Sequence, residues 1–329
     1  MLKDQIQELA VHCARYRTPN GWRAAGQIAT TTLPFFALFL AMYFSLDYSY
    51  WLTLALAVPT AGLLIRFFII QHDCGHGSFF SSKLANDITG RIISIVTLTP
   101  YAYWRRAHAL HHASSANLDR RGIGDITTLT VEEYRALPFL RRVGYRIYRN
   151  PFFLTIVGGV LHFLIIQRLP FTVQRSSWQM TTSVLALNAA IVAVYGALVY
   201  ALGWTDFLML FAPIVVVSSA GGVWLFYIQH QFEETHWSNE EEWDRKTAAV
   251  LGSSYYDLPK ILDWFTGNIG LHHIHHLCSQ IPNYRLQECM AAKPELADIN
   301  RMTIWESLKC ANLALWDEKS KRLVSFSGA

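Results

Sequence analysis

The stretch that decides the fold is YWLTLALAVPTAGLLIRFFIIQHDCGH, residues 50–76. Residues 50–70 form a continuous apolar run, and a helix of about twenty residues covers the roughly 30 Å of a bilayer core. The run ends just before His72 and His76, which are one helical turn apart. We therefore expect a membrane-spanning helix that delivers two imidazoles to one surface of the bilayer.

Three more apolar runs have a similar length, at residues 28–46, 182–202 and 207–228. Short links join the first of these to 50–70 and the last two to each other, so the four runs predict two helical hairpins. Prolines lie inside three of the runs, at Pro34, Pro59 and Pro213. Neighbouring membrane helices can satisfy the backbone groups that a proline frees. The sequence therefore predicts an integral membrane protein with four spans.

Composition supports this class of protein. Hydrophobic residues make up 52% and charged residues 16% of the 329 residues, whereas soluble domains usually carry about 25% charge. These proportions exclude a disordered chain, a coiled coil and an ordinary soluble enzyme. The net charge of +4 is too small to indicate nucleic-acid binding. The five cysteines form no Cys-x-x-Cys pair, so we expect free thiols in a reducing compartment.

The remaining segments predict helices around the spans. Residues 1–17 lack the apolar centre of a signal peptide, and their apolar side chains recur as in a helix lying on the bilayer surface. The shorter runs 88–103 and 152–166 predict interfacial or half-inserted helices. Near the end of the chain Ile304, Leu308, Ala311 and Leu315 recur at helical spacing, which predicts a helix that caps the domain. No repeat or linker interrupts residues 1–329, so we expect one all-α domain with a helical cap.

Arginine indicates the orientation of the spans. Residues 103–149 contain nine arginines against four acidic residues, and the two hairpin links contain no lysine or arginine. Positively charged loops remain on the cytoplasmic side of a membrane. We therefore expect this segment, both chain ends and the surface that carries His72 on the cytoplasmic side.

Most of the 13 histidines fall in three clusters with helical spacing. The clustered residues are His72, His76, His108, His111, His112, His272, His275 and His276. Residues three or four positions apart share a helix face, so each cluster can aim its imidazoles at one point. His273 lies about 100° around the helix from His272 and is expected to point elsewhere.

His230 follows the fourth apolar run and should emerge on the same surface as His72, with His236 as the alternative. Nine imidazoles exceed the ligands of one zinc site, so the set suits two metal ions. Imidazole binds iron, copper, nickel and zinc alike, and the spacing does not name the metal. The isolated His12 and His162 are interpreted as ordinary structural residues.

Carboxylates near the clusters are candidates for orienting the ligands, because metal-bound histidines usually donate their second ring N–H to an acceptor. The candidates by proximity in sequence are Asp73, Asp125, Glu233 and Glu234. Cys74 lies between two histidines of the first cluster and is expected to fill space rather than to bind metal.

The three boxes His-x-x-x-His, His-x-x-His-His and His-x-x-His-His resemble those of the membrane-bound fatty acid desaturases. The flanking segments 103–108, 122–126, 229–233 and 267–270 are similar to the acyl-lipid omega-6 (delta-12) branch. The resemblance covers roughly residues 71–286. Alkane hydroxylases, carotenoid ketolases and sterol oxidases share the boxes, so a hydroxylase or ketolase with the same centre is the alternative enzyme.

The resemblance implies two non-haem iron ions that use O2 and two electrons to leave a cis double bond in an acyl chain. The eight clustered histidines match the box ligands, and His230 matches the ligand between the second and third boxes. In acyl-CoA relatives an asparagine one turn before that histidine holds a water on iron, but Phe226 occupies this position here. Asn268, one turn before the third box, is the candidate to replace it.

Substrate and electrons come from outside the chain. We expect an acyl lipid whose tail enters a protein-lined tunnel. The candidate tunnel aromatics, for which an interfacial belt is the alternative, are Tyr101, Tyr103, Trp104 and Trp224. The sequence has no His-Pro-Gly-Gly segment of a fused haem domain, so we expect a separate ferredoxin or cytochrome b5-type donor. The arginine-rich segment could bind an acidic donor or contact lipid phosphates.

A membrane metal transporter is the alternative from another class of protein. Transporters place ionisable ligands near the middle of the bilayer, whereas the clustered histidines lie outside the four apolar runs. The sequence therefore favours an oxygen-dependent acyl-lipid desaturase over a transporter.

Overall fold

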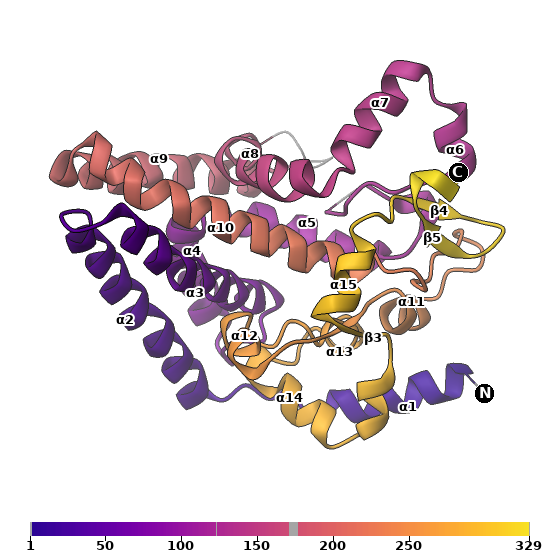
Figure 1. The fold of residues 1–329 in the computed structure, drawn as a ribbon. Helices are drawn as coiled ribbons and strands as arrows, with labels where there is room; N and C mark the ends of the chain where they lie inside the picture. Colours follow the sequence, from indigo (N-terminus) through magenta and orange to yellow (C-terminus); the bar gives the residue numbers. More distant parts are fainter. Residues whose placement is uncertain (1, 123, 171–176, 329) are drawn as a thin grey trace.

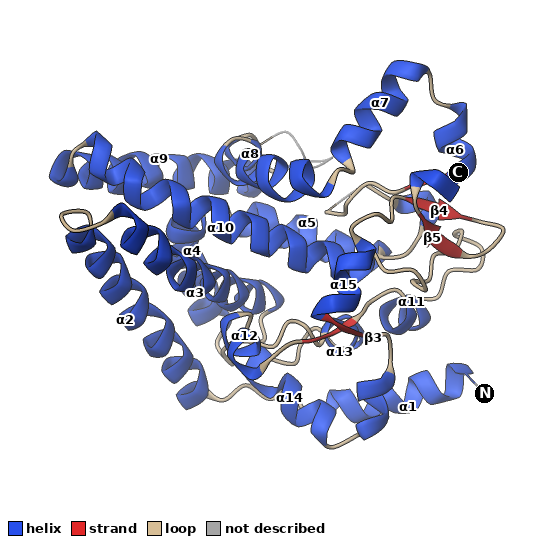
Figure 2. Cartoon of the chain, in the orientation of Figure 1, coloured by secondary structure: helices blue, strands red, loops and turns tan. Residues whose placement is uncertain are grey.

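The computed structural model describes residues 2–122, 124–170 and 177–328, and Ile123 of the segment 122–126 lies outside the described residues. Helices form most of the described chain, and its strands are short (Figure 2). Four long helices dominate the molecule (Figure 1), and two of them carry His72, His76 and His230.

The long helices form two hairpins. They are α2 (Gly21–Ser45), α3 (Tyr50–His76), α9 (Trp178–Leu202) and α10 (Trp204–His230). Each is long and apolar enough to cross a membrane, which confirms the predicted four-span helical membrane fold. α3 and α10 continue past the predicted runs and reach His76 and His230 without a break. His72, His76 and His230 are therefore held near the ends of membrane helices.

α3 lies between other helices and packs against α2, α10 and α4 (Lys83–Thr97). Ala57 and Ala61 of α3 are fully buried beside Met42 of α2 and Leu210 of α10. Small residues at such contacts let membrane helices approach closely. Both hairpin turns lie at one end of the molecule, at the left of Figure 1, and both chain ends lie at the other.

The predicted run 88–103 is divided between two helices. α4 ends at Thr97, Leu98 takes a left-handed conformation with a φ of 55°, and α5 (Tyr101–Ser114) begins after Pro100. A proline disfavours helical geometry in the residue before it and offers no backbone N–H. The break redirects the chain, and α5 brings its histidines back against α3.

The predicted run 152–166 is also divided. It contains the π-helix η2 (Phe153–Gly158), α8 (Gly159–Leu164) and the start of the 3-10 helix η3 (Ile166–Arg168). α6 (Val131–Ala136) and α7 (Phe139–Tyr148) precede it. α7 and residues 153–168 are together apolar enough for a span but are bent by 77° between them. The interfacial or half-inserted placement of this run stays a prediction.

Short helices and strands form a cap at the end that holds the termini. Its helices are η1 (Leu118–Arg120), α11 (Arg245–Leu251), α12 (Lys260–Phe265), α13 (His272–Leu277), α14 (Asn283–Ala291), η4 (Pro294–Asp298), α15 (Ile304–Cys310) and η5 (Phe326–Gly328). Its strands are β1 (Leu129–Thr130), β2 (Tyr255–Asp257), β3 (Arg301–Thr303), β4 (Leu315–Asp317) and β5 (Arg322–Val324). β4 pairs in parallel with β1 and antiparallel with β5, and β2 pairs in parallel with β3.

α1 (Leu2–Ala14) is the helix that the sequence predicts, but its apolar face does not lie on the bilayer. Leu9 and Cys13 are buried in one cluster with Ile274 of α13 and Cys289 of α14. Amphipathic spacing identifies an apolar face and not what covers it. In this protein α13 and α14 of the cap cover the apolar face of α1.

The C-terminal helix is shorter than predicted. A capping box between Thr303 and Glu306 starts α15, which ends at Cys310. Leu315 is instead fully buried in β4, where it pairs with Leu129. Strand pairing with a distant segment therefore overrides the helical spacing of residues 304–315.

Candidate metal centre

Four helices carry nine histidines to one place. α3 ends with His72 and His76, α10 ends with His230, and α5 and α13 supply three each. α3 stops directly after His76 because Gly77 takes a left-handed φ of 69°, which glycine adopts without strain. The long helices α3 and α10 thus position three of the nine imidazoles, those of His72, His76 and His230.

The imidazoles form two groups, and the candidate ligand atoms of each group lie within 4.8 Å of one another. The first group contains His72, His76, His108, His112 and His275. The second group contains His111, His230, His272 and His276. The structure differs here from the expectation that each cluster aims at one point, because α5 and α13 each send side chains to both groups. A rotation of about 100° per residue separates His111 from His112.

The Nε2 atoms have the spacing that a shared metal ion requires. In the first group His108 Nε2 lies 3.1 Å from His76 Nε2 and 3.0 Å from His112 Nε2. In the second group His111 Nε2 lies 3.1 Å from His230 Nε2. Two nitrogens bound at right angles to one metal, each at about 2.1 Å, would be about 3.0 Å apart.

Acceptors on the other ring nitrogen orient these lone pairs. His111 Nδ1 donates to Asp125 Oδ1, and His230 Nδ1 donates to the carbonyl oxygen of Gly252 at 2.9 Å. A neutral imidazole with its proton on Nδ1 presents a lone pair at Nε2. The Nε2 lone pairs of His111 and His230 therefore face a common point. A cation at this point would remove the repulsion between the two lone pairs. The residues present fit a metal ion.

Burial favours the neutral form of most imidazoles on α5 and α13. Five of them have a pKa well below that of an ordinary histidine, first because burial disfavours the charged ring and second because neighbouring imidazoles repel a proton. These residues are His108, His112, His272, His275 and His276. Neutral imidazole is the form that binds metal, so these five rings can bind a metal ion without first losing a proton.

Asp73 and Asp125 are the two predicted carboxylates that meet the histidines. Asp73 Oδ1 accepts from His72 Nδ1 at 3.0 Å. Its Oδ2 accepts from the backbone N and the side-chain Nδ2 of Asn283, at 2.6 Å and 2.8 Å. Sequence reasoning did not find Asn283 or the carbonyl of Gly252, because one is distant in sequence and the other is a backbone group with no side-chain signal.

Glu233, Glu234 and Asn268 lie elsewhere. The side chain of Glu233 is 64% exposed and faces Arg322 at 3.7 Å, and Glu234 is exposed. Asn268 donates to the backbone oxygen of Asn283 at 3.2 Å. Within the part of the chain that the structure describes, none of the three hydrogen-bonds a histidine of the two groups. The geometry therefore gives no support to their expected roles in orienting ligands or holding water.

Phe226 borders the second group. Its ring centroid lies 5.5 Å from that of His111 and 5.8 Å from that of His230. The aromatic ring of Phe226 has no amide group with which to hold a water beside these histidines.

The other histidines stay outside both groups. His236 is half-buried and belongs to neither, so His230 and not its rival joins the cluster. His273 Nε2 hydrogen-bonds the carbonyl oxygen of Leu296 at 2.9 Å, and burial lowers its pKa to about 4. It thus faces away from the groups, as the helical spacing predicts.

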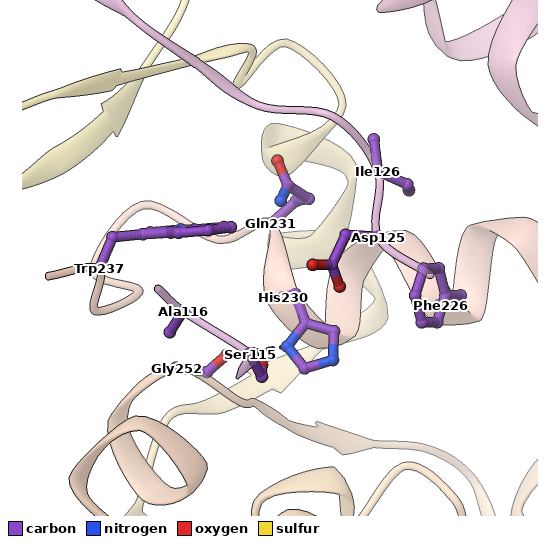
Figure 3. A pocket seen from close by; sticks show the side chains of 9 residues that line it. All are labelled: Ser115, Ala116, Asp125, Ile126, Phe226, His230, Gln231, Trp237 and Gly252. Carbon is purple, nitrogen blue, oxygen red and sulfur yellow. Dashed lines mark hydrogen bonds between the residues drawn. The ribbon is translucent and has the colours of Figure 1, made fainter. Parts of the chain in front are cut away.

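A small cavity of about 10 Å³ lies beside the second group. Asp125, His230 and Trp237 line it from three different segments, as Figure 3 shows. Asp125 Oδ2 is buried and has no hydrogen-bond partner among the described residues. The volume corresponds to about one water molecule.

A much larger cavity of about 490 Å³ begins at His72, His108 and His272. Its walls come from α3, α5, α8 and α10 and are mostly apolar. Of the predicted tunnel aromatics, Tyr103 and Trp104 line it.

Tyr101 and Trp224, the other two predicted tunnel aromatics, are not among the residues that line this cavity. The Tyr101 hydroxyl donates to the backbone oxygen of Cys74 at 2.8 Å. Trp224 stacks on Tyr227, with 5.8 Å between the ring centroids. Both rings therefore have structural contacts of their own.

Comparison with known proteins places the chain in a family. The fatty acid desaturase model matches residues 48–307. A fatty acid desaturase of Bacillus subtilis (strain 168) is 44% identical over 320 residues, covering 97% of this chain and 90% of that protein.

More distant relatives carry more specific names. An sn-1 oleoyl-lipid 12-desaturase of Synechocystis sp. is 25% identical, covering 87% of this chain and 79% of that protein. An sn-1 acyl-lipid omega-3 desaturase (ferredoxin) of Nostoc sp. (strain 36) is 29% identical, covering 73% of this chain and 68% of that protein. By its family match and its 44% identity to a desaturase over almost the whole sequence, this chain belongs to the fatty acid desaturases, a family of oxygen-dependent oxidoreductases.

Proposed function

We propose that this chain is an acyl-lipid desaturase of the omega-6 (delta-12) type, which introduces a cis double bond into the acyl chain of a membrane lipid. The observation that carries the proposal is that two groups of mostly buried imidazoles adjoin a large apolar cavity, which three of the histidines line. Removing hydrogen from an unactivated methylene group needs a strong oxidant next to an alkyl chain that is sheltered from water. The two features together meet this requirement.

Two non-haem iron ions are the proposed cofactors. The five histidines of the first group would hold one ion and the four of the second group would hold the other. Imidazole accepts zinc as readily, but zinc has no redox chemistry. Iron with O2, when bound, supplies the oxidising power that the reaction needs.

The chain's own residues orient the ligands and the substrate. Asp125 holds the Nδ1 proton of His111, which keeps Nε2 of that ring free to bind. Trp104 stacks on His108 with 4.6 Å between centroids and also forms part of the cavity wall. An acyl chain in the cavity would therefore lie against an aromatic surface beside the first group, with water excluded from the reacting carbons.

We infer that electrons come from a separate ferredoxin or cytochrome b5-type donor on the cytoplasmic side, where the metal groups and both chain ends would lie. The name of the Nostoc relative, with its mention of ferredoxin, supports such a donor. The position of both chain ends opposite the lysine- and arginine-free hairpin turns supports this orientation (Figure 1).

The test is fatty-acid analysis of membrane lipids from cells that express the chain, with and without added oleate. We expect new cis double bonds at the delta-12 position, lost in His111→Ala and in His275→Ala, because these variants remove one ligand from each group. His236→Ala is the matched control, since this ring belongs to neither group.

Other products would redirect the proposal. A double bond at another carbon would overturn the omega-6 (delta-12) assignment and leave the family intact. Hydroxylated or oxo lipids without an alkene would indicate a hydroxylase or ketolase. One exchangeable zinc or copper per purified chain, in place of two irons, would indicate a metal transporter.

A further inference from the structure

α7 presents an exposed apolar stripe. Phe139 is 72% exposed and Leu140 is 80% exposed, and Val143 and Ile147 are also exposed. On a helix these four side chains fall within an arc of about 100°. A contiguous apolar surface of this kind marks an interaction site rather than a part of the protein core.

The opposite face attaches α7 to the cap. Tyr145 is buried, its hydroxyl donates to the carbonyl oxygen of Ala314 at 2.7 Å, and it accepts from the backbone N of Leu129 at 3.0 Å. The hydroxyl of Tyr148 accepts from the backbone N of Thr127 at 3.0 Å. Because these contacts already fix the helix, the apolar stripe is free to meet something outside the chain.

The charge of α7 is entirely positive. It carries Arg141, Arg142 and Arg146 and no acidic residue. Arg141 and Arg142 are exposed, and the exposed Glu132 of the neighbouring α6 is balanced by the exposed Arg135. On the same helical wheel Arg142 flanks the stripe, and Arg141 lies on the polar face of the helix. An apolar stripe with arginines on its flank and on the polar face is the pattern of a helix that lies in the interface of an anionic membrane.

The place of α7 in the chain favours a membrane over a protein partner. α7 leads through a bend of 77° into residues 153–168, and the two together have the hydropathy of a membrane segment. Figure 1 shows α7 running across the direction of α9 and α10. If α9 and α10 cross the bilayer, α7 lies along its surface.

We propose that α7 is seated on the bilayer surface, with Phe139 and Leu140 among the lipid chains and Arg141 and Arg142 bound to the headgroups of anionic phospholipids. An acidic electron donor is the other partner that arginines attract. The long stripe of apolar side chains, continuous with a membrane segment, fits lipid better than it fits a transient redox partner.

Arg149 links this helix to the metal groups. It caps the C-terminal end of α7 and is only 3% exposed. Its Nη2 donates to Gln231 Oε1 at 2.7 Å, and its Nη1 donates to the backbone oxygen of Thr127 at 3.2 Å. Gln231 follows the ligand His230, and Thr127 lies two residues after Asp125, which orients His111. The seating of α7 therefore bears on one ligand of the second group and on the carboxylate that orients another. This consequence rests on the proposed function, whereas the binding of lipid does not.

The first experiment measures seating directly. A nitroxide attached to Leu140→Cys in the full chain is compared in nanodiscs of phosphatidylcholine and of phosphatidylcholine with an equal amount of phosphatidylglycerol. The native cysteines are buried, and an otherwise unchanged chain measures their background labelling. We expect the probe to collide mainly with O2 in the anionic discs and mainly with a water-soluble nickel chelate in detergent. A probe at Lys319→Cys, in an exposed loop, should meet the chelate in every case.

The second experiment removes the charge. Each arginine near an anionic surface contributes about fivefold to binding, so Arg141→Gln/Arg142→Gln should weaken seating roughly 25-fold in the anionic discs. Lys3→Gln/Arg15→Gln removes the same charge from an exposed position of α1 and from the exposed turn after it, and should change nothing. A probe that meets the chelate equally in both kinds of disc, or a double variant that keeps its lipid contact, would overturn the proposal.

Turnover separates this proposal from the proposed function. In anionic discs we expect the arginine variant to lose several-fold in kcat with an unchanged KM for the donor. A raised KM for the donor with unchanged probe accessibility would mean that α7 binds the donor, and the lipid proposal would be wrong. If the unaltered chain makes no alkene, the proposed function fails while the accessibility measurements still decide the seating.

Discussion

Replacing Asp73 by asparagine tests how the first group of histidines is held. The carboxylate is 1% exposed and accepts three hydrogen bonds, one from His72 and two from Asn283. Asparagine has nearly the same shape, but it offers a single oxygen and an NH2 group that can only donate. In Asp73→Asn the amide NH2 must therefore face either His72 Nδ1 or the donors of Asn283.

The cost follows from these contacts. A hydrogen bond to a charged group contributes about 1.5–3 kcal/mol, and a buried donor left without an acceptor costs about 1–3 kcal/mol. One lost bond and one orphaned donor together predict about 3–5 kcal/mol in the free energy of unfolding. Since the carboxylate also orients His72, metal affinity should fall by about 10–100-fold.

The assay has two readouts on protein purified in detergent: the thermal unfolding midpoint and the metal content after dialysis against a buffered iron solution. Asp47→Asn is the charge-matched control, because Asp47 is exposed in the first hairpin turn at the opposite end of the molecule. Adding Asn283→Ala to Asp73→Asn removes one of the facing donors and should recover part of the loss.

Two results would refute this reasoning. The first is Asp73→Asn with an unfolding midpoint and an iron content equal to those of the control. The second is strict additivity of Asp73→Asn and Asn283→Ala, which would mean that the two side chains do not depend on each other.

Three further outcomes are expected. Gly270→Ala should destabilise the chain by about 2 kcal/mol or more and displace α13, because its Cβ would stand 2.5 Å from the backbone oxygen of Tyr256; unchanged iron loading and thermal unfolding would contradict this. Glu233→Gln should stay within about 0.5 kcal/mol in stability and retain full activity, since its carboxylate is exposed and pairs with Arg322 at the surface; loss of bound iron would restore it as an orienting group. The metal-free protein should lose stability as the pH falls through about 6.5, because burial lowers the pKa of five histidines, His108, His112, His272, His275 and His276, so that the unfolded chain takes up protons that the folded chain does not bind; denaturant titrations between pH 8 and pH 5 check the sign, and a midpoint that rises on acidification would contradict it.

Local spacing in the sequence determined much of the site. Apolar runs long enough for a bilayer predicted the four membrane helices, and histidines one turn apart predicted imidazoles on shared faces. Helical spacing also predicted that His273 points away from the other histidines of its cluster. These features are readable because helix geometry repeats every few residues and depends on the nearby chain alone.

Only the tertiary structure decided how the imidazoles divide. His111 and His112 are neighbours in sequence and belong to different groups, while His112 shares a group with His275 of another helix. Packing of α5 and α13 against the ends of α3 and α10 sets this division. No spacing within one helix encodes the distance to another.

The limit to local spacing also explains which hydrogen-bond acceptors of the histidines could be predicted from the sequence. Asp73 and Asp125 were found because carboxylates stand out near histidine clusters, and Glu233 was chosen by the same rule although its side chain points to solvent. Asn283 and the carbonyl of Gly252 were missed because the folded chain brings them from distant segments. Helix periodicity therefore determines what a side chain can face, and long-range packing decides what it meets.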